Sequence, residues 1–284
     1  MRSKYRLGID AGGTFTDFIL ADKDGGVQIF KVLSTPNEPT KAIMNGLALI
    51  AETGISAQEI VSNADLCING TTVGLNALIT HNGAKTGLIA TSGHEDSIEI
   101  RLGHKEDGYR YDPDYPPATM LVPRHLRKGI EERVLSDGSV RTPLNEDQVR
   151  EACKYFIAEG VESVAISFVW SVLHPEHENR AAEIVREMMP GVRLTIGSQL
   201  YPQVREYTRT STAVVNAYLA PILQRYVEAI DAYFRELGSK HPVRYFQSNG
   251  GLALGKVVSD QSVYAINSGP ASAPQAALDV AEPW

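Results

Sequence analysis

The sequence predicts an α/β protein, and three observations lead to this fold class. Apolar runs of β-strand length alternate with amphipathic segments of helical length along most of the chain. Glycine-rich tight-turn signals separate the first three of these runs. Hydrophobic residues make up 43% of the 284 residues, which is enough for a sizeable core. Strands that alternate with helices are typical of a parallel or mixed sheet covered by helices.

The first third of the chain predicts a phosphate-binding lobe at residues 1–95. Strands are expected at 5–10, 14–21 and 27–33, then a helix at 39–52, a strand at 66–69, a helix at 72–80 and a strand at 86–90. Tight turns at Ala11-Gly12-Gly13 and Asp24-Gly25-Gly26 join the first three strands into an antiparallel meander. This order of elements is typical of a ribonuclease-H-like fold, the unit that actin-like ATPases use twice.

The middle of the chain predicts an additional α/β lobe at residues 96–240, inserted into the first lobe or following it. A long loop at 101–123 holds four prolines, and ordered loops of this length are often functional. A hairpin is expected around Ser136-Asp137-Gly138-Ser139. The other elements expected are helices at 145–159, 175–189 and 208–237 and strands at 164–169 and 192–196. A strand at 243–247 then begins a further lobe, 241–284, which we expect to be truncated.

Composition excludes several classes of protein. The net charge of -7 argues against a nucleic-acid partner. No window approaches the roughly 18 apolar residues of a membrane span. The two cysteines, Cys67 and Cys153, are isolated, which favours neither a disulfide framework nor a cysteine zinc site. We therefore expect a soluble cytoplasmic protein.

The segment DAGGTFTD, residues 10–17, is the strongest candidate for chemistry. Its candidate residues are Asp10, Gly12, Gly13, Thr14, Thr16 and Asp17. Glycines let a backbone turn approach a ligand, and the free N–H groups of such a turn hold anions. The two threonines add hydroxyl donors, and Asp10 can hold a hydrated Mg²⁺ that bridges phosphates. The alternative is a plain hairpin turn with a polar tip. The segment matches neither G-x-x-x-x-G-K-[ST] nor G-x-G-x-x-G.

Three further turns join strands to helices or follow a strand. They contribute the candidates Gly70, Thr71, Thr72 and Asn76, then Asn249, Gly250 and Gly251, and finally Ser268 and Gly269. Helix N-termini attract anions, so phosphate or substrate contacts are one interpretation. The alternative is that Thr71, Thr72 or Ser268 only caps a helix start, and for Ser268 this alternative is favoured.

Two weaker groups of candidates lie in the middle lobe or at its start. His174 and His177 have metal-like spacing, but a proline lies between them and no third ligand is apparent, so a solvated helix start is favoured. Four residues before the prolines of the long loop can reach a substrate, although ordinary loop polarity is the favoured interpretation; they are His94, Glu95, Asp96 and His104.

Seven segments together resemble the hydantoinase A / 5-oxoprolinase family. They are, in order, LGIDAGGTFTDFIL, NGTTVGLNALI, LVPRHLR, ERVLSDGSV, REYTRTSTAVVNAYLAPIL, QSNGG and NSGPAS, and they span almost the whole chain. The resemblance implies an actin-like ATPase fold, Mg-ATP, and phosphorylation of a carbonyl oxygen on a small-molecule substrate. It also implies that Asp10 and Asp17 are catalytic, that Asp10 holds Mg²⁺ through water, and that a hydantoinase B-like subunit is the partner.

The resemblance leaves the reaction open between ATP-driven opening of a cyclic amide and ATP-driven carboxylation of a ketone such as acetone or acetophenone. A non-catalytic scaffold subunit that retains the fold is the alternative from another class. No second D-x-G-G-T segment appears, although an actin-like ATP site needs two such hairpins. We therefore expect an exposed apolar face, and a fragment or short subunit that is inactive and binds ATP weakly when alone.

Overall fold

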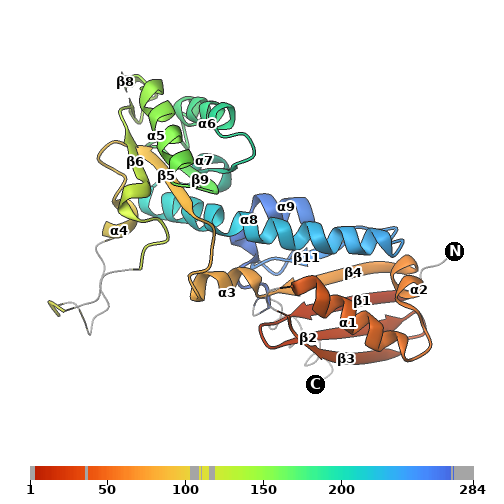
Figure 1. The fold of residues 1–284 in the computed structure, drawn as a ribbon. Helices are drawn as coiled ribbons and strands as arrows, with labels where there is room; N and C mark the ends of the chain where they lie inside the picture. Colours follow the sequence, from red (N-terminus) through yellow and green to blue (C-terminus); the bar gives the residue numbers. More distant parts are fainter. Residues whose placement is uncertain are drawn as a thin grey trace. The chain divides into compact units, whose positions relative to one another are not determined.

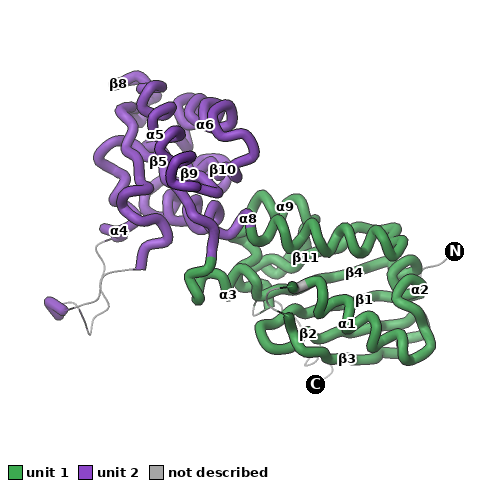
Figure 2. Tube along the Cα trace, viewed as in Figure 1, with its two compact units in different colours: residues 1–82, 222–284 green, residues 83–221 purple. Residues whose placement is uncertain are grey.

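The chain divides into two compact units with unequal shares of the sequence. The computed structural model describes residues 4–35, 38–102, 109, 111–114, 119–269 and 271. Unit 1 consists of residues 1–82 and 222–284, and unit 2 of residues 83–221 (Figure 2). Unit 2 is therefore inserted into the sequence of unit 1, which was one of the two arrangements left open. The predicted boundaries at 95 and 240 differ from this division because β5 (Thr86–Thr91) joins the sheet of unit 2 and β11 (Arg244–Phe246) joins that of unit 1.

Unit 1 is built on a six-stranded sheet with the order β12-β11-β4-β1-β2-β3 (Figure 1). Its further elements are β1 (Tyr5–Ala11), β2 (Phe15–Asp22), β3 (Val27–Leu33), α1 (Pro39–Ala51), α2 (Ala57–Ser62), β4 (Ala64–Thr71), α3 (Val73–Ile79), β12 (Leu252–Leu254), α9 (Gly255–Asp260) and the 3₁₀ turn η3 (Ser262–Ala265). The first three strands form the predicted antiparallel meander, and β4 and β11 continue the sheet in parallel with β1. The carboxyl ends of β1, β4 and β11 therefore lie at one edge of the sheet.

One face of the meander is covered and the other is open. Helix α1 packs against β2 and β3, and the ring of Phe18 lies directly under Gly46 of α1. On the opposite face, five large apolar side chains are exposed: Phe15, Ile19, Val27, Ile29 and Leu33. These residues pair across β2 and β3, Phe15 with Leu33 and Ile19 with Ile29, so they share one face. The predicted exposed apolar face is present.

Unit 2 contains a four-stranded sheet with the order β10-β9-β5-β6, in which all pairs are parallel. Its other elements are α4 (Ser97–Ile100), η2 (Arg124–Leu126), β6 (Arg127–Ile130), β7 (Arg133–Val134), β8 (Val140–Thr142), α5 (Glu146–Ala158), β9 (Ser163–Ser167), α6 (Glu176–Met188), β10 (Arg193–Ile196) and α7 (Gly197–Leu200). Every residue of β5 and β9 is buried, as expected for strands covered on both faces.

The long helix α8 (Glu206–Glu236) contributes its first half to unit 2 and its second half to unit 1. The predicted hairpin is confirmed by the pairing of β7 with β8, and Asn145 caps α5 by accepting from the Gln148 N–H. Helices α2, α4, α7 and α9 and strands β6 and β12 were not predicted. Of the predicted loop at 101–123, residues 103–108, 110 and 115–118 lie outside the described residues, as do 272–284 of the predicted truncated lobe.

Among the described helices, none has the length and apolar character that a membrane crossing requires.

Candidate functional site

The candidate residues gather at the edge of the unit 1 sheet where β1 and β4 end. Asp10 lies opposite Gly70, and Ala11 lies opposite Thr71 in the parallel pairing of these strands. The Thr72 N–H donates to the Ala11 carbonyl over 3.1 Å, which ties the two turns together where the strands stop. A Cβ on Gly70 would lie 3.3 Å from Asp10 Oδ1, so a glycine there leaves the carboxylate room.

Hydrogen bonds hold the base of the turn between β1 and β2, whereas the residues at its tip are exposed. The Gly12 N–H donates to the Phe15 carbonyl (3.1 Å), and the Gly12 carbonyl accepts from the Ser34 hydroxyl (2.7 Å). Gly13 and Thr14 are exposed, and no acceptor within the described part of the chain binds either backbone N–H. A turn with two free, exposed N–H groups is able to bind an anion.

Thr16 does not contribute a free hydroxyl, contrary to the prediction. Its side chain is buried, and its hydroxyl lies 2.9 Å from Ser34 Oγ. Because Ser34 gives its own proton to the Gly12 carbonyl, the Thr16 hydroxyl is the donor to Ser34. Thr16 therefore holds the base of the turn and does not face a ligand.

The charges beside the turn are unbalanced. Asp10 and Asp17 are cross-strand partners, and Lys31 pairs with Asp17 at 3.0 Å. Asp10 has no cationic partner among the described residues. Partial burial and the negative charge of Asp17 both raise the pKa of Asp10 above its usual value. The Asp10 carboxylate is thus placed to receive a cation.

No cluster of three or more metal-ligating side chains occurs within the residues that the structure describes. A magnesium ion at this edge would therefore need water or ligand oxygens for most of its coordination. Such a coordination suits Mg²⁺, which usually keeps several waters and binds through one or two carboxylates plus phosphates. Asp10 is the residue that fits this role.

The two threonines of the turn after β4, Thr71 and Thr72, make different hydrogen bonds. The buried Thr71 hydroxyl accepts from the Val73 N–H (3.2 Å) just before α3. This contact is not the helix cap of the capping interpretation, because the N-cap residue of α3 is Thr72 and its side chain makes no cap hydrogen bond. The Thr72 hydroxyl donates to the Ala11 carbonyl (3.3 Å) and accepts from Asn76 Nδ2 (3.3 Å). A Cβ on Gly13 would lie 3.4 Å from that amide nitrogen. Thr72 and exposed Asn76 therefore lie beside the open turn, and Thr71 shapes the backbone.

The two later segments reach the same edge. The buried Ser268 hydroxyl donates to the Thr71 carbonyl over 3.1 Å and so fastens the turn, a contact that differs from the helix cap favoured from the sequence. Asn249 Oδ1 accepts from the Gly251 N–H (2.8 Å) in the turn between β11 and β12. Gly250 occupies the left-handed region in this turn, with φ of 80°. Asn249 and Gly250 are exposed, and Gly269 is half-buried beside Ser268.

The sequence did not reveal a buried hydrogen bond, between Tyr226 and Asn69, that stabilises this edge of the sheet. Tyr226 of α8 is buried, and its hydroxyl donates to Asn69 Oδ1 (2.8 Å) on the last part of β4. Burial raises the pKa of Tyr226 to about 12. Asn69 is fully buried, and its Nδ2 has no partner among the described residues. A tyrosine within a long amphipathic helix has the pattern of an ordinary core residue, so no sequence signal distinguishes it.

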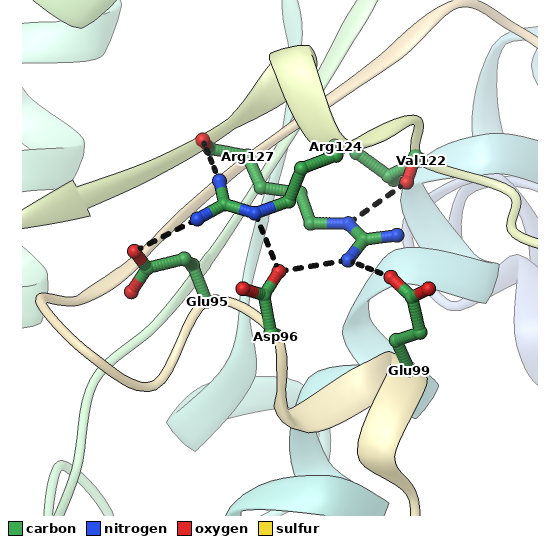
Figure 3. A network of polar contacts seen from close by, with 6 residues as sticks. All are labelled: Glu95, Asp96, Glu99, Val122, Arg124 and Arg127. Carbon is green, nitrogen blue, oxygen red and sulfur yellow. Dashed lines mark hydrogen bonds and ion pairs between the residues drawn. The ribbon is translucent and has the colours of Figure 1, made fainter.

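The weaker unit 2 candidates Glu95 and Asp96 belong to an ion-pair network (Figure 3). Arg124 contacts Glu95 (3.3 Å) and Asp96 (2.8 Å), and Arg127 contacts Asp96 (2.9 Å) and Glu99 (2.6 Å). The Arg127 side chain is only 1% exposed and also donates to the Val122 carbonyl. These contacts fix the segment after β5 to the start of β6, a structural role that differs from the ordinary loop polarity favoured from the sequence.

The chain belongs to the hydantoinase/oxoprolinase family. Residues 6–189 match the Hydantoinase/oxoprolinase N-terminal region, and residues 209–282 match the family described as Hydantoinase/oxoprolinase.

Relatives with known names are longer than this chain. Caprolactamase subunit alpha of Pseudomonas jessenii is 62% identical over 284 residues, which is 100% of this chain and 41% of that protein. The crystal structure of ATP-dependent caprolactamase from the same organism superposes with a TM-score of 0.91 at 63% identity, over 98% of this chain and 40% of that one. A nucleotide-free acetone carboxylase structure superposes with a TM-score of 0.87 at 30% identity, over 99% and 41%. The chain thus spans about two fifths of the relatives it matches.

Proposed function

We propose that this chain is part of an ATP-dependent enzyme that phosphorylates the carbonyl oxygen of a cyclic amide. In this proposal unit 1 is a ribonuclease-H-like lobe of the actin-like ATPase type and binds the phosphates. Its sheet supports the assignment, because an antiparallel meander of β1, β2 and β3 continues through the parallel strands β4 and β11. The caprolactamase relative is called ATP-dependent, which supports ATP as the phosphoryl donor.

One observation carries the proposal: free anion-binding donors and an uncompensated carboxylate lie side by side. The exposed N–H groups of Gly13 and Thr14 suit phosphate oxygens, and Asn76 Nδ2 lies beside them. Asp10 suits the cation that accompanies a nucleotide triphosphate. A plain hairpin turn has no need of both features at one strand end.

Each candidate residue then has a proposed task. Asp10 holds Mg²⁺ through water, while Asp17 and its partner Lys31 adjust the charge beside it. The backbone N–H groups of Gly13 and Thr14 and the side chain of Asn76 contact phosphate, while Gly12 and Thr72 hold the shape of the turn. Residues on the β11 side of the same edge contact the rest of the nucleotide; they are Asn249, Gly250, Gly251 and Gly269. Gly70, Thr71, Thr16 and Ser268 shape the turns.

Bound Mg-ATP would supply the phosphoryl group that makes an amide oxygen a good leaving group. The chain contributes positioning and charge neutralisation, which supply most of the catalysis of phosphoryl transfer. The identity of 62% to caprolactamase subunit alpha, against 30% to acetone carboxylase, favours a cyclic amide over a ketone. The word subunit in that relative's name supports a partner subunit, which we propose is hydantoinase B-like.

A second candidate function is ATP-dependent carboxylation of a ketone. The TM-score of 0.87 with acetone carboxylase favours it, because the fold carries both chemistries. The third reading, a scaffold without activity, accounts for the fold but not for the uncompensated Asp10 carboxylate beside free N–H donors.

The test is ATP hydrolysis by the full-length polypeptide together with its co-purifying subunit, with caprolactam or acetone as the added substrate. We expect caprolactam to stimulate hydrolysis, and Asp10→Asn to lower kcat/KM by about 100-fold, the usual effect of removing one electrostatic contact in a preorganised site. Asp65→Asn is the control, since Asp65 is an exposed unit 1 carboxylate paired with Arg6. Unchanged hydrolysis in Asp10→Asn would contradict the proposed site, and stimulation by acetone alone would favour the second candidate.

A further inference from the structure

The chain passes between its two units twice (Figure 2). It leaves unit 1 after Asn82 and returns to it after Pro221, so the backbone joins the units at residues 82–83 and 221–222. Each connection contains a backbone feature that a rigid junction does not need. These features indicate where the chain is able to bend.

The second connection is a proline inside a helix. Pro221 lies in the interior of α8, which runs from Glu206 to Glu236. Because proline has no N–H, the Ala217 carbonyl loses the donor that another residue at 221 would supply, and the proline ring also crowds that carbonyl. Sharp bends in helices occur at such positions. The helix that joins the two units is therefore least resistant to bending at this residue.

The first connection follows the end of α3. The Asn82 N–H donates to the Ala77 carbonyl (3.0 Å) and the His81 N–H donates to the Leu78 carbonyl (3.4 Å), which is the pattern of a Schellman motif. His81 takes the left-handed position of this motif with φ of 52°, where glycine is the residue without strain. Helix α3 ends there, and Asn82 and Gly83 follow outside any helix or strand. A short irregular segment thus forms this connection.

Tyr218 brings the two connections together. Its hydroxyl accepts from the Gly83 N–H (2.8 Å), and its carbonyl accepts from the Ala84 N–H (3.0 Å). A Cβ on Gly83 would lie 1.9 Å from the Tyr218 ring, so a glycine is required for this close approach. Tyr218 is buried and lies three residues before Pro221, which is about 4.5 Å along the axis of α8. These contacts all lie within unit 2, and they hold the start of that unit beside the helical turn that the proline weakens.

We propose that residues 81–84 and 217–222 form a hinge about which unit 2 turns relative to unit 1. Two connections far apart would lock the orientation of two units, whereas two connections tied side by side leave rotation about one point free. Hinges are a few loop or element-terminal residues that absorb backbone changes while packed units move as bodies. The change falls on Asn82 at one connection and on Pro221 at the other, while Tyr218 holds the two connections together. This inference does not depend on the ATP chemistry of the proposed function.

Pulsed electron–electron double resonance on the full-length polypeptide measures the hinge. Spin labels carried by non-natural amino acids replace exposed Gln28 of unit 1 and exposed Glu187 of unit 2, and this pair reports the distance between the units. A second pair, at Gln28 and exposed Lys256, reports a distance within unit 1. We expect the distance distribution between the units to be at least about twice as broad as the distribution within unit 1. Equal widths would overturn the proposal.

Three variants test which residues form the hinge. Pro221→Ala restores the helical N–H and should narrow the distribution between the units to the width found within unit 1. Tyr218→Phe removes the acceptor of the Gly83 N–H and should broaden the distribution further. Pro143→Ala is the matched control, since Pro143 is an exposed unit 2 proline outside the helices, and should leave the width unchanged. An unchanged width in a folded Pro221→Ala protein, or an equal narrowing by Pro143→Ala, would overturn the proposal. Should Pro221→Ala fail to fold, an unchanged width in Tyr218→Phe would overturn it.

Discussion

Tyr226→Phe tests the support beneath the candidate phosphate edge. The substitution removes one hydroxyl and leaves the ring in place. Asn69 Oδ1 then loses the donor that lies 2.8 Å away, in a side chain that is fully buried. Since Asn69 Nδ2 already lacks a partner in the described structure, the amide is left without either of these contacts. A buried acceptor left unsatisfied costs about 1–3 kcal/mol, so the free energy of unfolding of unit 1 should fall by about that amount.

The assay is urea unfolding of the chain, with Tyr233→Phe as the control. Tyr233 lies on the same helix, also within unit 1, and its hydroxyl has no hydrogen-bond partner among the described residues. The control should stay within about 0.5 kcal/mol of the wild type. If Tyr226→Phe loses no more than the control, the Tyr226–Asn69 hydrogen bond does not stabilise this edge, and the reasoning from burial fails.

Two further stability predictions follow from the same unit. Gly46→Ala places a Cβ 2.1 Å from the Phe18 ring and should destabilise the chain by about 1–3 kcal/mol in urea unfolding, whereas Gly8→Ala, with its nearest contact at 3.8 Å, should be nearly neutral. The pKa of Asp10 is raised in the folded protein, so the charged carboxylate opposes folding. The loss of stability grows as the pH rises above 3.8, the usual pKa of an aspartate side chain. Asp10→Asn should therefore gain stability relative to wild type at pH 7 and show little gain at pH 3; an equal gain at both pH values would show that Asp17 repulsion and burial are not the cause.

The sequence predicted the type of most elements but not the partners of two strands. The residues of β5 are all buried, so the same apolar run suits either sheet. Proximity along the chain placed β5 with β1–β4, yet β11 takes the position next to β4 after the insertion of unit 2. Hydrophobic periodicity defines the secondary structure of a segment, whereas sheet order depends on contacts between distant segments.

In the candidate site too, features of the local sequence could be predicted, whereas contacts between distant segments could not. The glycine turn at residues 12–14 was predicted from the local sequence, and its N–H groups at Gly13 and Thr14 are open, while anion binding there stays a prediction. The error at Thr16 was avoidable, because strand residues alternate in direction and Thr16 shares its face with the core residue Phe18. The contact between Glu132 and His177 could not be predicted from the sequence, since the two residues come from different elements that only the tertiary structure brings together.

The charges at the edge of unit 1 explain why this turn differs from an ordinary hairpin. Like charges directly opposite on neighbouring strands are destabilising, and Asp10 faces Asp17 in this relation. Lys31 compensates only one of the two carboxylates. A sequence selected for stability alone would replace Asp10 by a neutral residue, because the contacts that hold the turn are made by backbone groups and by the hydroxyls of Thr16, Ser34 and Thr72. In the proposed function, a cation at Asp10 would relieve this cost, and an anion at the N–H groups of Gly13 and Thr14 would keep that cation in place. The destabilising carboxylate is therefore the strongest physical reason to propose a cation-bound phosphate ligand at this turn.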